Sequence, residues 1–171
     1  MSEFVSRLVG VMMLKRGPQD LPAGTVPLLA ATILYVAATA LSLSVGEGPG
    51  NTAGILLLAV ALPLVLTRIV LALRRRPARW IQTVTALFGT SGLLSLLSLP
   101  LAAAAQGAGA NASPDPILTV ASLVLFFWSF AIDGHIWRHA LDTSFAAGLA
   151  VAVVLFAVSM YVITTLAGPL S

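Results

Sequence analysis

A short run of arginines near the middle of the chain constrains the fold more than any other feature. Leu73 to Trp80 reads Leu-Arg-Arg-Arg-Pro-Ala-Arg-Trp, holds four of the nine Lys and Arg residues and separates two long apolar stretches. An arginine at the centre of a bilayer costs about 2.5–3.5 kcal/mol or more, whereas short basic loops stay on the cytoplasmic side of a membrane. The arginine run therefore predicts a cytoplasmic loop between two membrane-spanning segments.

The composition is typical of a membrane protein. Hydrophobic residues make up 58% of the 171 residues and charged residues 9%, against roughly 45–50% and about 25% in soluble domains. Too little polar surface remains to cover a water-soluble particle, so lipid must cover most of the fold, and helices satisfy the backbone there. We therefore predict an all-α, polytopic transmembrane helical bundle. Because the chain contains no cysteine, disulfides and thiolate metal sites are excluded.

Five apolar stretches have the length that crosses a bilayer as a helix. Three Lys and Arg residues precede the first stretch, four lie in the arginine loop and Arg138 follows the fourth, while the other two connections have none. This alternation predicts a cytoplasmic amino terminus and an outward carboxyl terminus. The short, arginine-rich chain is typical of a bacterial inner-membrane protein, whose carboxyl terminus would be periplasmic. The predicted spans, within a transmembrane domain at 23–171, are 26–45, 53–73, 80–103, 117–136 and 145–166.

The first 22 residues have the pattern of an amphipathic helix at the membrane surface. Their apolar side chains form two adjacent helical rows, and Glu3 and Arg7 lie on the other side. The apolar part is too short to span about 30 Å, and Gly17-Pro18 is expected to end the helix. We therefore predict a cytoplasmic interfacial segment at 1–22. The two rows comprise Phe4, Val5, Leu8, Val9, Met12 and Met13.

Polar side chains gather at the cytoplasmic end of the fourth predicted span. His135, His139 and Asp142 are spaced i, i+4 and i+7, so they would project from one face of a helix. Two imidazoles and a carboxylate could form part of a zinc or iron site, or could relay protons. The simplest interpretation is a polar helix end that meets headgroups and water, in which Arg138 pairs with Asp142. On that interpretation we predict no metal and no cofactor.

Two charged residues lie deeper in the predicted spans. Arg68 lies about one and a half turns inside the basic end of the second span, and Asp133 lies at comparable depth on the fourth. The Arg68 side chain can extend to the membrane surface, or it can face the bundle and pair with Asp133. The candidates for a polar relay within the membrane are Arg68, Asp133, His135 and Arg138. Those expected to contact lipid headgroups are Arg74, Arg75, Arg76 and Arg79.

Small residues recur at helical spacing in the third and fifth spans. Such stripes let helices approach closely and exchange hydrogen bonds, so we expect packing faces within the bundle or toward a partner. For the serine stripe the alternative is a polar translocation path. The stripes comprise Ser91, Ser95 and Ser98 in the third span and Ser144, Gly148 and Ala152 in the fifth.

The layout resembles the Yip1-type family of small five-pass membrane proteins. A cytoplasmic amino terminus, five closely spaced spans, short loops and an outward carboxyl terminus carry this resemblance. Gln19-Asp20-Leu21-Pro22 is loosely similar to the Asp-Leu-Tyr-Gly-Pro signature of the family's eukaryotic members. The resemblance implies a non-enzymatic role in organising membranes or in holding other membrane proteins.

The sequence thus predicts a scaffold or accessory subunit that is not an enzyme and that binds lipid and other membrane proteins or further copies of itself. It contains no Gly-x-Ser-x-Gly and no His-Glu-x-x-His. Because the arginines flank apolar segments, nucleic acid is not an expected partner. The alternative is a small transporter or channel subunit with a polar relay at the cytoplasmic end of the fourth span. Five spans cannot divide into two equal halves, so that role needs an oligomer or a larger partner.

Overall fold

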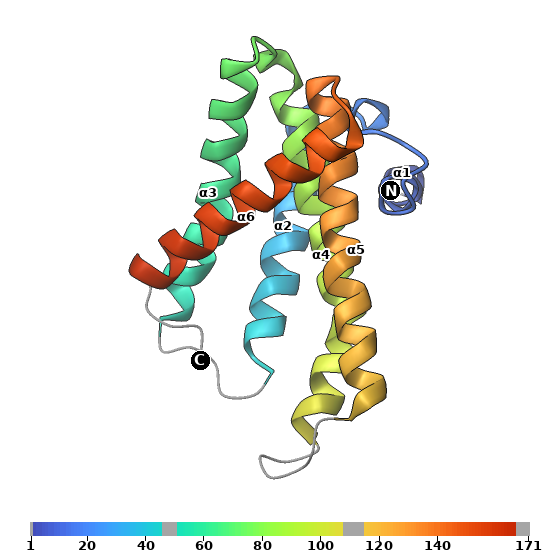
Figure 1. Ribbon diagram of the computed structural model, residues 1–171, viewed down its shortest axis with the longest axis vertical. Coiled ribbons are helices and arrows are strands. Elements are labelled where there is room, and N and C mark those ends of the chain that lie inside the picture. The colour runs from blue at the N-terminus through green and yellow to red at the C-terminus, as the bar shows by residue number, and fades with distance from the viewer. Residues whose placement is uncertain (1, 46–50, 108–114, 167–171) are drawn as a thin grey trace.

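The computed structural model describes residues 2–45, 51–107 and 115–166, and every regular element within these ranges is a helix (Figure 1). The all-α fold predicted from the sequence is confirmed. The elements are α1 (Ser2–Met12), the 3-10 turn η1 (Pro18–Asp20), α2 (Thr25–Leu43), α3 (Thr52–Leu73), the 3-10 turn η2 (Pro77–Arg79), α4 (Trp80–Gly107), α5 (Pro116–Leu141) and α6 (Phe145–Leu166).

Helices α2 to α6 are each long and apolar enough to cross a membrane, as the sequence predicted. The chain is therefore an integral membrane protein. One of these helices is longer than expected. α4 continues through an alanine-rich turn to Gly107, past the predicted end at residue 103, because alanine favours a helix. α5 ends at Leu141, beyond the predicted span at 117–136 and next to Asp142, as the helical spacing of His135, His139 and Asp142 predicts.

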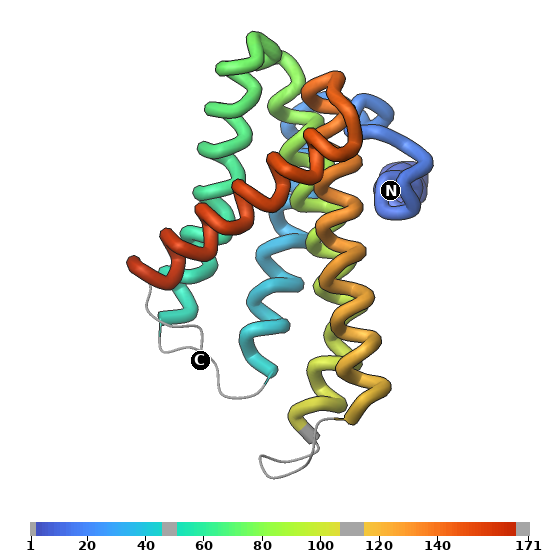
Figure 2. The backbone as a smooth tube through the Cα atoms, viewed as in Figure 1, coloured from blue at the N-terminus to red at the C-terminus, as the bar shows by residue number. Residues whose placement is uncertain are grey.

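The helices form an elongated bundle with α4 at its centre (Figures 1 and 2). α4 contacts α1, α2, α3 and α5, and it packs most extensively along α2. α6 packs against α5 and then slants across the bundle to reach α3. The α3–α4 and α5–α6 connections lie together at one end of the bundle, which we call the basic end because it carries the arginine loop.

The tightly packed core surrounds α4. Val84, Ala86 and Phe88 of this helix are at most 1% exposed. The Phe88 ring stacks on the Tyr35 ring of α2 with centroids 4.9 Å apart. Because lipid is as apolar as these side chains, close packing and hydrogen bonds hold such helices together more than burial does.

The amino-terminal helix packs onto the bundle with only one of its two apolar rows. α1 is seen end-on beside α5 and lies across the bundle (Figure 2). Leu8 and Val11 are buried against Ala86 of α4 and Ile136 of α5. The other row, Val5, Val9 and Met13, is 41–50% exposed. An exposed apolar row on a helix that crosses the bundle fits the predicted contact with the membrane surface.

α5 and α6 approach each other closely at a pair of glycines. A Cβ added at Gly148 would lie 2.6 Å from the Arg138 backbone nitrogen and would meet the Gly134 carbonyl oxygen. Gly148 and Ala152 are both buried, which confirms most of the packing face predicted for the fifth span. Ser144 does not belong to it, because its Oγ accepts a 3.2 Å hydrogen bond from the Ala147 nitrogen at the start of α6.

Candidate functional site

The arginine loop is fastened to the carboxyl-terminal end of α5. Arg79 Nη1 donates to the carbonyl oxygens of His139 and Ala140, at 2.8 and 3.1 Å. Arg76 Nη1 and Arg79 Nη2 both donate to Asp142 Oδ2. These bonds satisfy the last carbonyls of α5 and place positive charge at the negative end of the helix dipole. Arg76 and Arg79, which were predicted to contact lipid headgroups, therefore bind the carboxyl-terminal end of α5. Their contact with lipid stays a prediction.

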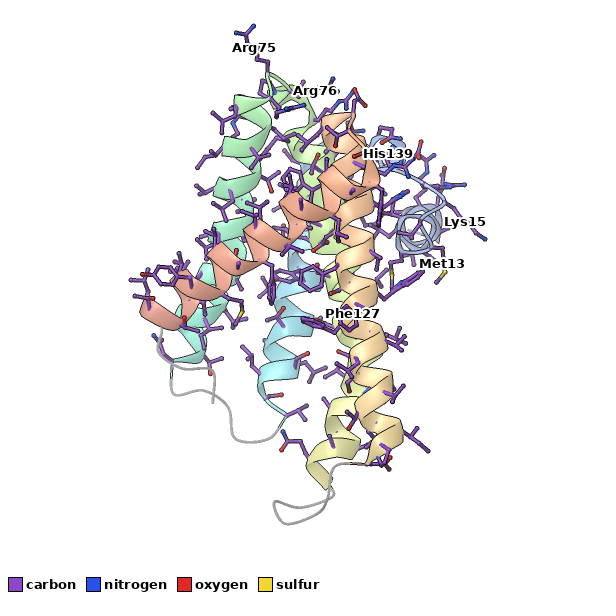
Figure 3. All side chains as sticks on the ribbon, viewed as in Figure 1. Met13, Lys15, Arg75, Arg76, Phe127 and His139 are labelled. Carbon is purple, nitrogen blue, oxygen red and sulfur yellow. The ribbon has the colours of Figure 1, made fainter. Side chains whose placement is uncertain are left out.

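The predicted pairing of Arg138 with Asp142 is wrong. α5 ends at Leu141, and Asp142 has a left-handed backbone with φ of 50°. The Asp142 side chain therefore leaves the helical path and reaches Arg76 and Arg79. Arg138 is exposed, as are Arg74 and Arg75, and Arg75 extends away from the basic end (Figure 3). Contact of these arginines with lipid headgroups stays a prediction.

The contact between Asp142 and the two arginines should persist to low pH. Hydrogen bonds from Arg79 and then Arg76 lower the pKa of Asp142 from its ordinary 3.8 to about 2. Because the folded-state pKa is depressed, the stabilisation is complete above the ordinary pKa and is lost as pH falls from 3.8 towards 2. Thermal unfolding of the parent and of Asp142→Asn should differ at neutral pH and converge over that interval. A difference that is unchanged below pH 2 would contradict the assignment.

The two histidines of the predicted trio meet, and the carboxylate does not join them. The rings of His135 and His139 are in edge contact with centroids 4.6 Å apart, while Asp142 is turned to the arginine loop. His135 is buried, and its Nε2 donates to the Arg16 carbonyl oxygen at 2.9 Å. Among the residues that the structure describes, no three His, Asp or Glu side chains are placed to hold a metal ion. His135 instead fastens the segment after α1 to α5.

Removing the His135 bond should loosen the amino-terminal segment locally. His135→Leu deletes the donor to Arg16, and a hydrogen bond of this kind contributes about 1 kcal/mol. We expect amide exchange in residues 2–20 to accelerate about fivefold, since about 1.4 kcal/mol corresponds to tenfold. Hydrogen–deuterium exchange measures this directly. His139→Leu is the matched control, because no hydrogen bond joins the His139 side chain to another described residue; equal acceleration in both variants would refute the role of His135.

Arg68 does not pair with Asp133. The Arg68 side chain is exposed, and its guanidinium carbon lies 5.8 Å from the ring centroid of Trp80. The neighbouring Thr67 is 1% exposed and faces the bundle. Successive helical residues point about 100° apart, which lets Thr67 face inward while Arg68 faces outward. Of the two placements considered for Arg68, the structure therefore has the outward one.

Asp133 lines a half-open cavity between the five spanning helices. The cavity has a volume of about 200 Å³, and all five spanning helices contribute to its wall. On α3, α5 and α6 the lining residues are three, four or seven positions apart, which is the spacing of one helical face. Each of these helices therefore turns one face to the cavity. We call this space the central cavity. Its polar side chains are Tyr35, Thr67, Ser91, Asp133 and Ser159.

The Asp133 carboxylate has no protein counter-charge in the central cavity. Within residues 2–45, 51–107 and 115–166, Asp133 forms no ion pair and no side-chain hydrogen bond. Around it the cavity offers hydroxyl groups, which both donate and accept hydrogen bonds. Ionisable groups within a membrane are costly and usually serve proton relays, ion pathways or ligand binding. A carboxylate with neighbouring hydroxyl oxygens can take up a proton or bind a cation.

The serine stripe of α4 lines a second space that shares a residue with the central cavity. A groove of about 390 Å³ runs between α4 and α5, and Ser91 lines both spaces. The stripe therefore lines a groove and does not form a fully packed helix contact. Only the α4 side of this groove was predicted, because the two α5 serines, spaced i and i+7, were not singled out in the sequence. The serines along it are Ser91, Ser95, Ser98, Ser122 and Ser129.

The sequence identified Asp133 but missed most of the residues around it. Tyr35 and Ser159 are single polar residues within apolar spans, and Thr67 was overlooked beside Arg68. Such isolated residues carry no spacing signal that would group them. Their common feature emerges only when the helices are assembled.

No protein-family model, no curated protein and no solved structure matches this chain. The resemblance to the Yip1-type family is neither supported nor contradicted by these comparisons. It stays a prediction from the layout.

Proposed function

We propose that this chain is a non-enzymatic subunit of a small transporter or channel, and that it binds a proton or another cation at Asp133 in the central cavity. The observation that carries the proposal is the placement of this carboxylate, without a protein counter-charge, in a cavity lined by all five spans. A purely structural carboxylate in a membrane would be expected to have a partner.

The groove between α4 and α5 supports a route from the central cavity toward the other end of the bundle. Ser91 belongs to both spaces, and Ser95 and Ser98 continue along α4 one turn at a time. Hydroxyl groups at this spacing can pass hydrogen bonds from one to the next or solvate a moving cation. This arrangement favours the translocation path over the packing face as the role of the serine stripe.

We further propose that the basic end is cytoplasmic and that the membrane is a bacterial inner membrane, which makes the carboxyl terminus periplasmic. Supporting this, the arginine loop and Arg138 lie at the same end of the bundle, in accord with the positive-inside rule. Because five spans do not form two equal repeats, we propose that the subunit works as a homo-oligomer or with another membrane protein. Membrane lipids are its surroundings and nucleic acid is not a partner.

Flux through vesicles containing the purified protein tests this proposal. Vesicles that enclose a pH-sensitive dye and carry an imposed potassium gradient report proton entry, and the same vesicles with an ion-sensitive dye report sodium. We expect flux above that of protein-free vesicles. Absence of flux, together with recovery of a fixed-stoichiometry partner from native membranes, would instead support the scaffold or accessory-subunit role.

A further inference from the structure

We infer that the cation taken by the central cavity is a small alkylammonium ion. This inference rests on the proposed function and names the ligand class of the same site. It draws on the apolar part of the cavity wall, which the binding of a proton or a metal ion would not require. Three kinds of observation carry it: the aromatic side chains, the cavity volume and the charge.

Four aromatic side chains line the same cavity as Asp133, and two of them, Tyr35 and Phe88, stack on each other. Tyr35 comes from α2, Phe88 from α4, Trp137 from α5 and Phe156 from α6, and all four line the central cavity. Aromatic faces attract cations, and they do so most strongly for alkylated ammonium groups, which are weakly hydrated and lose little on leaving water. Hard inorganic cations instead bind through shells of oxygen ligands and gain little from aromatic walls. The wall therefore suits an organic cation better than an inorganic one.

Asp133 supplies the complementary charge. Trp137 is one helical turn beyond it on α5, so the carboxylate and the indole share one face of the same helix. Phe88 and Ser91 are three residues apart on α4, and they add an aromatic side chain and a hydroxyl group to the part of the cavity wall that α4 forms. A cation here would neutralise a carboxylate that no described basic side chain neutralises. Arg68, the nearest candidate in the sequence, faces away toward Trp80.

The volume limits the size of the ligand. The cavity measures about 200 Å³, which is below the roughly 300–1,000 Å³ of sites for drug-sized molecules. An ammonium group with a few short alkyl substituents matches this volume. Choline and tetramethylammonium are suitable probes of this class.

Calorimetric titration of the full chain in lipid nanodiscs tests the ligand class. The probe is choline, and its comparison is 3,3-dimethylbutan-1-ol, which has the same shape without the charge. We expect choline to bind and the alcohol to bind at least about a hundredfold more weakly, because the carboxylate and the aromatic faces both act on charge. Equal binding of the two probes would overturn the inference, since the cavity would then recognise only shape and apolarity.

A pair of phenylalanine variants outside the buried core tests the aromatic contribution, and each ring packs edge-to-face on Phe126. Phe156 lines the cavity and is 44% exposed, whereas Phe127 is 65% exposed and does not line it. Phe156→Leu should weaken choline binding about threefold to tenfold, and Phe127→Leu should leave it unchanged. If both variants bind choline like the parent, the aromatic wall has no part in recognition and the inference fails.

The outcomes for the ligand class and for the proposed function can be told apart. If protons or sodium ions cross the vesicles in a manner that depends on Asp133 while choline does not bind, the alkylammonium assignment is wrong and the proposed function stands. If choline does not bind and no flux is measured, both fail. Choline binding that is lost in Asp133→Asn and retained in Asp115→Asn, an exposed carboxylate at the start of α5, would support both.

Discussion

Replacing Asp133 with asparagine is expected to reduce cation flux about tenfold or more while leaving the folded protein as stable as before or more stable. Asparagine keeps the shape of the side chain and removes its charge. A charge-assisted contact is roughly twice as strong as a neutral one, and each 1.4 kcal/mol is about tenfold in an equilibrium constant. Flux in vesicles and thermal unfolding in detergent measure the two effects on the same preparation.

The sign of the stability change distinguishes a functional carboxylate from a structural one. A charged residue deep in a span costs about 2.5–3.5 kcal/mol, and no ion pair among the described residues offsets this cost for Asp133. Removing the charge should therefore relieve the cost. Asp115→Asn, which changes an exposed carboxylate that caps α5, is the control and should preserve flux. A large loss of stability in Asp133→Asn would show that the carboxylate holds the bundle together.

Gly148→Ala is expected to destabilise the bundle by about 3 kcal/mol or more. Inserting a methyl group into a well-packed site costs about 1–3 kcal/mol when side chains can move aside. At Gly148 the neighbouring atoms are backbone atoms, the Gly134 carbonyl oxygen and the Arg138 nitrogen. α6 would have to move away from α5, which would open the wall of the central cavity. The thermal midpoint in detergent measures the loss.

Gly54→Ala is the matched control for that prediction. The methyl group added at Gly54, in the first turn of α3, would meet the side chain of Asn51, which caps this helix by accepting a 3.0 Å hydrogen bond from the Gly54 nitrogen. Shifting this side chain costs at most the cap, about 1 kcal/mol. Alanine also favours a helix over glycine by about 1 kcal/mol, so we expect little change in stability. Similar midpoints for Gly148→Ala and the parent would show that the α5–α6 crossing is looser than the structure describes.

The spans could be predicted from the sequence because lipid imposes one requirement on each of them independently. Every spanning segment must be helical, apolar and about 20 residues long, so no knowledge of neighbours is needed. The contacts that hold the carboxyl-terminal end of α5 depend on the tertiary structure instead. Arg79, far away in the chain, caps the last turn of α5, and no local pattern around residues 136–141 indicates that contact.

The candidate site could be predicted only in part for a similar reason. Asp133 was identified because a carboxylate inside an apolar span is unusual by itself. Its surroundings depend on how each helix is rotated about its axis, which packing decides. For α3 this rotation places Thr67 at the cavity and Arg68 outside, so the hypothesis of an Arg68–Asp133 pair was wrong although the two residues lie at comparable depth.

Infrared difference spectroscopy of Asp133 tests the central claim most directly. The carboxyl group absorbs at different frequencies when it is protonated, ionised or paired with a cation, and Asp133→Asn identifies its band. We predict that adding choline, or a step in pH, changes this band in the parent protein and that the change is absent from Asp133→Asn. A carboxyl band that responds to neither would contradict the account, because Asp133 would then bind neither a proton nor a cation.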